Sequence, residues 1–145
     1  MSSPASLLPF QSINFTTTAP GKRLMVTGAV HGNEVAGTHG IRRVVAEIER
    51  GELALARGSV TFVPITNPKA YALKRRNGDR NLNRNLTPTD TPTEFEDHIA
   101  NWLCPLFARH DALDAHPRAK AAMRTPLESA AAAGCTPGRR ATWIG

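Results

Sequence analysis

Two apolar segments separated by an amphipathic stretch shape the first half of the chain. Leu24 to Val30 is mostly apolar, as expected of a strand that is covered on both faces. The next apolar positions recur at i, i+3, i+4 and i+7, which predicts a helix with one apolar face: Ile41, Val44, Val45 and Ile48. Basic Arg50 and then Gly51 mark its end. A second strand is predicted over Ser59 to Ile65. A strand, a helix and a strand in this order indicate a βαβ unit with a parallel sheet.

Further elements are predicted on either side of this unit. Ile13 to Thr18 is typical of a strand. Thr93 and Glu96 form a capping-box pattern, with Thr93 as the N-cap of a later helix. An apolar stripe then follows along that helix: Phe95, Ile99, Trp102, Leu103 and Leu106. Residues 66–92 have no helical period and are rich in Asn, Arg, Asp, Thr and Pro. A polar segment of this length in a compact domain is usually functional or disordered.

The composition changes after about residue 115. Residues 117–145 contain eight alanines, four arginines and three prolines, without a β-branched run or a long apolar period. We expect this segment to be disordered or non-native, or to form an alanine-rich helix over residues 126–133.

The net charge of +6 and the pI near 10.2 raise nucleic acid as a partner. Residues 116–145 hold five Lys/Arg and one Glu, so this segment carries +4 of the +6. Residues 1–115 hold 13 basic and 11 acidic residues, which gives only +2. Aromatic residues make up 6% of the chain, and none lies among the arginines of residues 75–84. The charge distribution therefore argues against a nucleic-acid binder.

The location of the chain is predicted from what its sequence lacks. No stretch reaches the roughly 18 apolar residues of a membrane helix, so no membrane partner is expected. Residues 1–10 lack the basic start and apolar segment of a secretory signal, which favours the cytoplasm. Cys104 and Cys135 have no metal-binding or catalytic spacing and are interpreted as buried or incidental thiols. The oligomeric state stays open.

A histidine and a carboxylate follow the first buried strand as His31-Gly-Asn-Glu34. Ligand crevices in open α/β sheets form at the carboxyl ends of strands, and imidazole and carboxylate are zinc donors. Glu34 is expected at the start of the next helix, where the helix dipole favours an ionised carboxylate. The simpler interpretation is a strand-to-helix turn with Asn33 as the N-cap.

A second polar segment follows the next strand. It begins with Asn67-Pro68 and continues as a basic, amide-rich stretch from Arg75 to Arg84. Arginine forks bind carboxylates and stabilise oxyanions through paired hydrogen bonds. The alternatives are a solvated basic loop and a phosphate-binding loop.

Taken in order, these motifs resemble the succinylglutamate desuccinylase/aspartoacylase family, zinc deacylases related in fold to the M14 zinc carboxypeptidases. The resemblance rests on Gly28 to Gly37, Asn67-Pro68, Arg76 and Asn81-Leu-Asn-Arg84, within roughly residues 20–116. It implies a three-layer α/β/α fold with a mostly parallel or mixed central sheet, incomplete at the C-terminus. Residues 1–116 would then be the N-terminal part of a catalytic domain.

The resemblance also implies roles for individual residues. His31 and Glu34 correspond to two zinc ligands, with one Zn²⁺ per chain. Arg76 corresponds to the arginine that polarises the scissile carbonyl, and Asn83 and Arg84 to the pair that grips a substrate carboxylate. The implied reaction is zinc-assisted hydrolysis of an N-acyl amide, or an ester, of a small carboxylate-bearing substrate.

This sequence departs from the family pattern at three points. The third zinc ligand falls on His116 in Leu113-Asp-Ala-His116, where Pro117 replaces the family's serine. Asn81 stands where the family usually has Asp, and we expect it to affect loop packing more than chemistry. The family's general-base glutamate has no counterpart, because the one acidic residue after His116 is Glu128, in an alanine-rich context. We therefore expect a truncated or frame-shifted deacylase with impaired activity.

Other functions remain open at this point. A zinc carboxypeptidase would use the same ligands and arginines. A non-catalytic fragment that binds zinc poorly or not at all, and a basic phosphate or nucleic-acid binder, come from other classes. His39, His98 and His110 lie on or near predicted helices and are interpreted as structural or surface residues.

Overall fold

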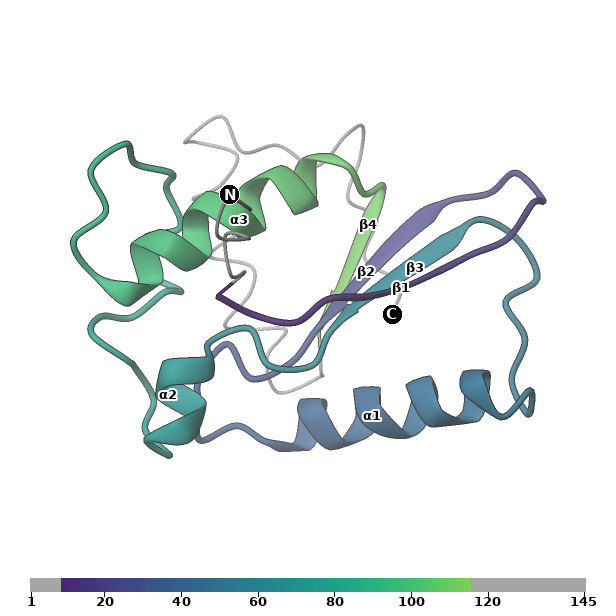
Figure 1. Cartoon of the computed structure of the whole chain (residues 1–145), viewed down its shortest axis with the longest axis horizontal. Helices are drawn as coiled ribbons and strands as arrows, with labels where there is room; N and C mark the ends of the chain where they lie inside the picture. Colours follow the sequence, from purple (N-terminus) through teal and green to yellow (C-terminus); the bar gives the residue numbers. More distant parts are fainter. Residues whose placement is uncertain (1–8, 116–145) are drawn as a thin grey trace, which may run out of the picture.

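The computed structural model describes residues 9–115, which form one mixed sheet with helices on both faces (Figure 1). The strand order is β1-β3-β2-β4. The strand β1 runs antiparallel to β3, whereas β2 runs parallel to both of its neighbours, β3 and β4. The strands are β1 (Ile13–Thr16), β2 (Arg23–Thr27), β3 (Ser59–Val63) and β4 (Ala112–Ala115), and the helices are α1 (Ala36–Glu49), α2 (Pro68–Ala72) and α3 (Phe95–Ala108).

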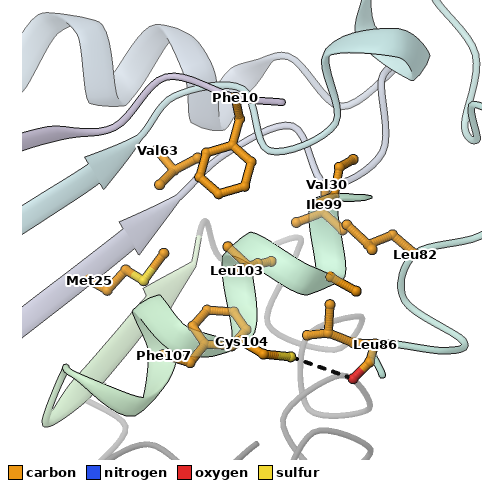
Figure 2. Close-up of a cluster of buried hydrophobic side chains, with 11 residues drawn as sticks. Phe10, Met25, Val30, Val63, Leu82, Leu86, Ile99, Leu103, Cys104 and Phe107 are labelled. Carbon is orange, nitrogen blue, oxygen red and sulfur yellow. Dashed lines mark hydrogen bonds between the residues drawn. The ribbon is translucent and has the colours of Figure 1, made fainter. Parts of the chain in front are cut away.

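Side chains alternate between the two faces of the sheet and build two cores. On one face, Ile41 and Val45 of α1 cluster with Val60 and Phe62 of β3. On the other face, the buried side chains of α3 cluster with Met25 and Val63, as Figure 2 shows. The helices α1 and α3 thus lie on opposite sides of the sheet (Figure 1), and the predicted three-layer α/β/α arrangement is confirmed.

The βαβ unit is confirmed, with shorter strands than predicted. The strand β2 ends at Thr27 and not at Val30, and β3 ends at Val63, directly before Pro64. The helix α1 begins at Ala36 with Val35 as N-cap and without a side-chain cap, so the interpretation of Asn33 as N-cap is wrong. Its predicted end is confirmed, because Arg50 is the C-cap and Gly51 adopts φ +73°.

The start of α3 differs from the predicted capping box. The N-cap is Glu94 and not Thr93, and the Asp97 carboxylate accepts hydrogen bonds from the backbone N–H groups of both residues. Glu96 is fully buried and does not cap the helix. Trp102, predicted on the apolar stripe, is 39% exposed, whereas Phe107 is buried in the core.

The predicted polar segment contains the short helix α2. Asn67 is its N-cap and accepts a hydrogen bond from the backbone N–H of Ala70, and Pro68 lies in the first turn. Five residues are too few to show an apolar period, so the sequence pattern could not reveal this helix.

Other predictions concern single residues. Cys104 is buried, as predicted, and His39 and His98 are exposed. His110 is buried between Thr61 and the Leu106 carbonyl. His116, Glu128 and Cys135, with the whole predicted tail of residues 117–145, lie outside the described residues. No helix within residues 9–115 is long and apolar enough to cross a membrane.

Candidate functional site

The chain segments that follow β2 and β3 stay paired beyond the ends of the strands. The backbone N–H of Gly28 donates to Val63 O, that of Thr66 to Gly28 O and that of Asn67 to Ala29 O. Ala29 adopts φ +47°, an uncommon value for a residue other than glycine. Strained backbone of this kind clusters at functional sites, and here it lies two residues before His31.

A tight turn carries His31 and Glu34 against α2. A Cβ added at Gly32 would lie 2.0 Å from the backbone carbonyl atoms of Ala70, so only glycine fits this close approach. The Glu34 N–H donates to His31 O at 3.1 Å, and the Gly32 N–H donates to Arg76 O at 3.4 Å. The turn therefore fixes both side chains relative to the loop that begins at Arg76.

His31 is 1% exposed and has a partner at each ring nitrogen. Nδ1 lies 3.2 Å from Glu34 Oε1, and Nε2 lies 3.2 Å from Asn81 Oδ1. The Asn81 oxygen also accepts the backbone N–H of Asn83, at 3.0 Å, which fixes the orientation of the amide. Because this oxygen can only accept, Nε2 of His31 carries a hydrogen, and whenever the ring is neutral its lone pair lies on Nδ1.

Two acceptors therefore face one another at 3.2 Å, Nδ1 of His31 and Oε1 of Glu34. A proton or a metal ion between them relieves their repulsion. Two donors of one tetrahedral zinc, each about 2.0–2.2 Å from the ion, lie about 3.4 Å apart. The pair fits two positions of a zinc site in donor chemistry and in spacing.

The predicted substrate residues lie along the same loop. Arg76 Nη1 is 3.5 Å from Glu34 Oε1, and its side chain is 53% exposed. Asn83 is 7% exposed, and its Oδ1 is a buried oxygen without a hydrogen-bond partner among the described residues. Arg84 is exposed and donates its backbone N–H to Asn81 O. An exposed guanidinium beside Glu34 and an unsatisfied buried amide are suited to a polar ligand.

Ion pairs hold this loop against α3. Arg80 contacts Glu94 at 3.0 Å and Asp97 at 2.8 Å, and Lys69 pairs with Asp79. The backbone N–H groups of Glu94 and Thr93, together with Arg80, hold the pKa of Asp97 well below its ordinary value. The Lys69 ammonium lowers the pKa of Asp79. These carboxylates are ionised at neutral pH, so that Asp97 ties the loop to α3 through Arg80 and Asp79 ties it to α2 through Lys69.

The described residues bring together His31, Glu34 and Arg76, with Asn83 and Arg84 on the same loop. Within residues 9–115, no group of three His, Cys, Asp or Glu side chains is placed to hold a metal ion, and the predicted third ligand, His116, lies outside them.

Sequence reasoning missed two contacts in this region. The Asn81 side chain reaches the His31 ring, so its position bears on chemistry as well as on packing. The Glu96 side chain accepts hydrogen bonds from residues that precede it by 16 to 29 positions in the sequence, and no local sequence pattern reveals such contacts.

Comparison with solved structures identifies the same fold in other proteins. An aspartoacylase family protein from Mesorhizobium loti is 27% identical, with a TM-score of 0.60, and the match covers 73% of this chain and 33% of that one. Murine aminoacylase 3 is 30% identical, with a TM-score of 0.52, over 68% of this chain and 36% of that one. A succinylglutamate desuccinylase from Silicibacter sp. matches in fold, with 23% identity and a TM-score of 0.63, over 73% of this chain and 32% of that one.

The chain spans about a third of the length of these solved relatives. No curated protein sequence matches it. The catalytic-domain profile of the succinylglutamate desuccinylase/aspartoacylase family matches residues 20–123, a segment that includes His31, the Arg76–Arg84 loop and His116. The family comprises deacylases, and its members are hydrolases. The chain therefore belongs to the succinylglutamate desuccinylase/aspartoacylase family.

Proposed function

We propose that this chain carries the metal-binding and substrate-binding part of a zinc-dependent deacylase for small N-acylated substrates that bear a carboxylate. His31 and Glu34 would hold the zinc ion through Nδ1 and Oε1. His116 would complete the set, and the family profile extends over its position. When bound, zinc supplies Lewis-acid polarisation and activation of water.

The remaining chemistry belongs to the chain's own side chains. Arg76, half exposed beside Glu34, would donate hydrogen bonds to the carbonyl oxygen as negative charge develops there. Asn83 and Arg84 would donate hydrogen bonds to the substrate carboxylate, from the side-chain NH2 group and the guanidinium, and so orient the scissile bond.

The observation that carries this proposal is the pairing of His31 and Glu34 in a site that also presents Arg76. Nδ1 of His31, whose tautomer is fixed by Asn81, lies 3.2 Å from Oε1 of Glu34, and a cation bound by both atoms would relieve the repulsion between these two acceptors. The adjacent guanidinium is suited to an anionic or polarised oxygen. A solvated basic loop would not place these groups around a histidine that is 1% exposed.

Calorimetric titration of the zinc-loaded chain with N-succinylglutamate tests the proposal. We expect saturable binding that weakens at least tenfold in Arg84→Met, with Arg43→Met, an exposed arginine on α1, as the matched control. Hydrolysis of a panel of N-acyl amino acids, compared with peptides that have a free C-terminus, then separates deacylase from carboxypeptidase activity. Binding that is equally strong in Arg84→Met and the wild type would contradict the proposal.

A further inference from the structure

Glu96 is a buried carboxylate whose hydrogen bonds within residues 9–115 include no cationic partner. It is 0% exposed, and it lies in the first turn of α3. Buried charges are ordinarily paired with an opposite charge, because removal from water is costly. Glu96 instead accepts hydrogen bonds from amide groups alone.

These amide groups belong to the loop between the proposed substrate residues. Glu96 Oε1 accepts the backbone N–H of Gly78 at 2.8 Å, and Oε2 accepts that of Arg80 at 3.2 Å. The N–H of Asp79 lies 3.1 Å from both oxygens. Three successive N–H groups thus form an anion-binding nest around one carboxylate. Arg76 lies two residues before this nest and Asn81 one residue after it.

The same carboxylate reaches the segment beyond β3. Asn67 Nδ2 donates to Glu96 Oε1 at 2.9 Å, and the Asn67 backbone N–H donates to Ala29 O. Gly78 lets the loop approach this closely, because a Cβ there would lie 2.6 Å from Glu96 Oε1. A contact in the opposite direction also joins the loop to α3, because Asp79 Oδ2 accepts a hydrogen bond from the backbone N–H of Phe95 at 2.8 Å.

We infer that Glu96 is a positioning residue that fixes the Gly78–Arg80 segment. By holding this segment it orients Arg76, which precedes it, toward the substrate carbonyl. It likewise orients Asn83 and Arg84, which follow it, toward the substrate carboxylate. This inference rests on the proposed function. Glu96 does not touch the substrate, because its oxygens are buried and are occupied by the loop and by Asn67. His31 and Glu34 lie on the turn against α2, and Asn81, next to this segment, also contacts the His31 ring.

The test compares Glu96→Gln with Glu49→Gln, the same substitution at an exposed residue of α1 away from the loop. For Glu96→Gln we expect at least tenfold weaker binding of N-succinylglutamate, and at least tenfold faster hydrogen exchange at Gly78, Asp79 and Arg80. Zinc affinity should fall by less than the ligand affinity, because the turn against α2 also holds His31 and Glu34. Glu49→Gln should keep ligand affinity within twofold. If Glu96→Gln does not fold, Gly78→Ala disturbs the same contact from the loop side.

Wild-type ligand affinity and exchange rates in both Glu96→Gln and Gly78→Ala would overturn the inference. An equal loss of affinity in Glu49→Gln would also overturn it, because the loss would then not depend on the contact with the loop. Absence of ligand binding by the wild-type chain would contradict the proposed function itself. The exchange rates would in that case still decide whether Glu96 holds the loop.

Discussion

At the scale of single residues, Asn81 joins the proposed metal pair to the proposed substrate loop. Its side-chain oxygen accepts from the His31 ring and from the backbone N–H of Asn83, and its carbonyl accepts from Arg84. A neutral amide orients the imidazole but polarises it less than a carboxylate does, and such outer contacts tune the affinity of a metal site. The family's usual Asp at this position would add a negative charge next to the ring.

Substitution of Asn81 measures this contribution. We predict about tenfold weaker zinc binding in Asn81→Ala, because the ring loses the acceptor that holds its tautomer. Asn81→Asp should bind zinc more tightly than the wild type, since a carboxylate raises the basicity of the ring. Chelator-competition titrations give the affinities. Nitrogen-15 NMR of the metal-free protein should detect the proton on Nε2 of His31; a proton fixed on Nδ1 alone at neutral pH would contradict the assignment.

At the scale of elements, the sequence predicted best where burial is periodic. The apolar runs of β2 and β3 and the stripe of α1 located the βαβ unit, because side chains that face a core repeat with the period of the element. The ends of the elements depend on local contacts. Pro64 and Gly51 correctly predicted the ends of β3 and α1, whereas the N-cap of α3 is Glu94 and not the predicted Thr93. Contacts distant in sequence gave no signal.

The same limit applies to the site. His31 and Glu34 were accessible to prediction because they lie three positions apart on one turn. The contact of His31 with Asn81 spans 50 residues, and the contact of Asn67 with Glu96 spans 29. Both depend on how the loop folds onto α3. The motif order could therefore suggest that Asn81 and Arg76 matter, but not which atoms they meet.

Two glycines of neighbouring elements should respond to substitution in opposite ways. Gly32→Ala forces a Cβ to within 2.0 Å of the backbone of α2, and we predict a loss of about 2–3 kcal/mol in the free energy of unfolding. Gly40→Ala meets nothing within 4 Å in the interior of α1, and alanine should stabilise that helix by about 0.5–1 kcal/mol. Urea unfolding of both variants provides the measurement; similar effects in both would contradict the turn geometry.

At the scale of the whole molecule, one end of the sheet carries the candidate site, and the opposite end carries an ion pair that supports the fold. The carboxyl ends of β2 and β3 lead into His31 and the substrate loop. Here Ala29 has a positive φ, and Gly32 packs closely against the backbone of Ala70. The opposite end is held by Arg23 at the start of β2, which pairs with Asp111 through side-chain contacts at 2.9 and 3.1 Å. This pair connects β2 to the segment between α3 and β4, and thus supports the fold at a distance from the site.

Asp111 should give the fold a defined pH dependence. Hydrogen bonds from Arg23 lower the pKa of Asp111 to about 2, against about 3.9 in an unfolded chain. The unfolded state therefore binds this proton first, and the contribution of Asp111 is complete above about pH 4 and lost as the pH falls toward 2. We predict that Asp111→Asn costs about 0.5–1 kcal/mol at pH 7, because the pair is partly exposed. Urea unfolding should find that the two proteins converge between pH 4 and pH 2; a constant difference would contradict the assignment.

The central claim is that His31 and Glu34 bind zinc, and a zinc titration of the full chain with three histidine variants tests it most directly. We predict one zinc per chain in the wild type, with affinity at least tenfold weaker in His31→Ala and in His116→Ala. His39→Ala, which removes an exposed histidine from α1, should bind zinc as the wild type does. Unchanged zinc affinity and stoichiometry in His31→Ala would contradict the account.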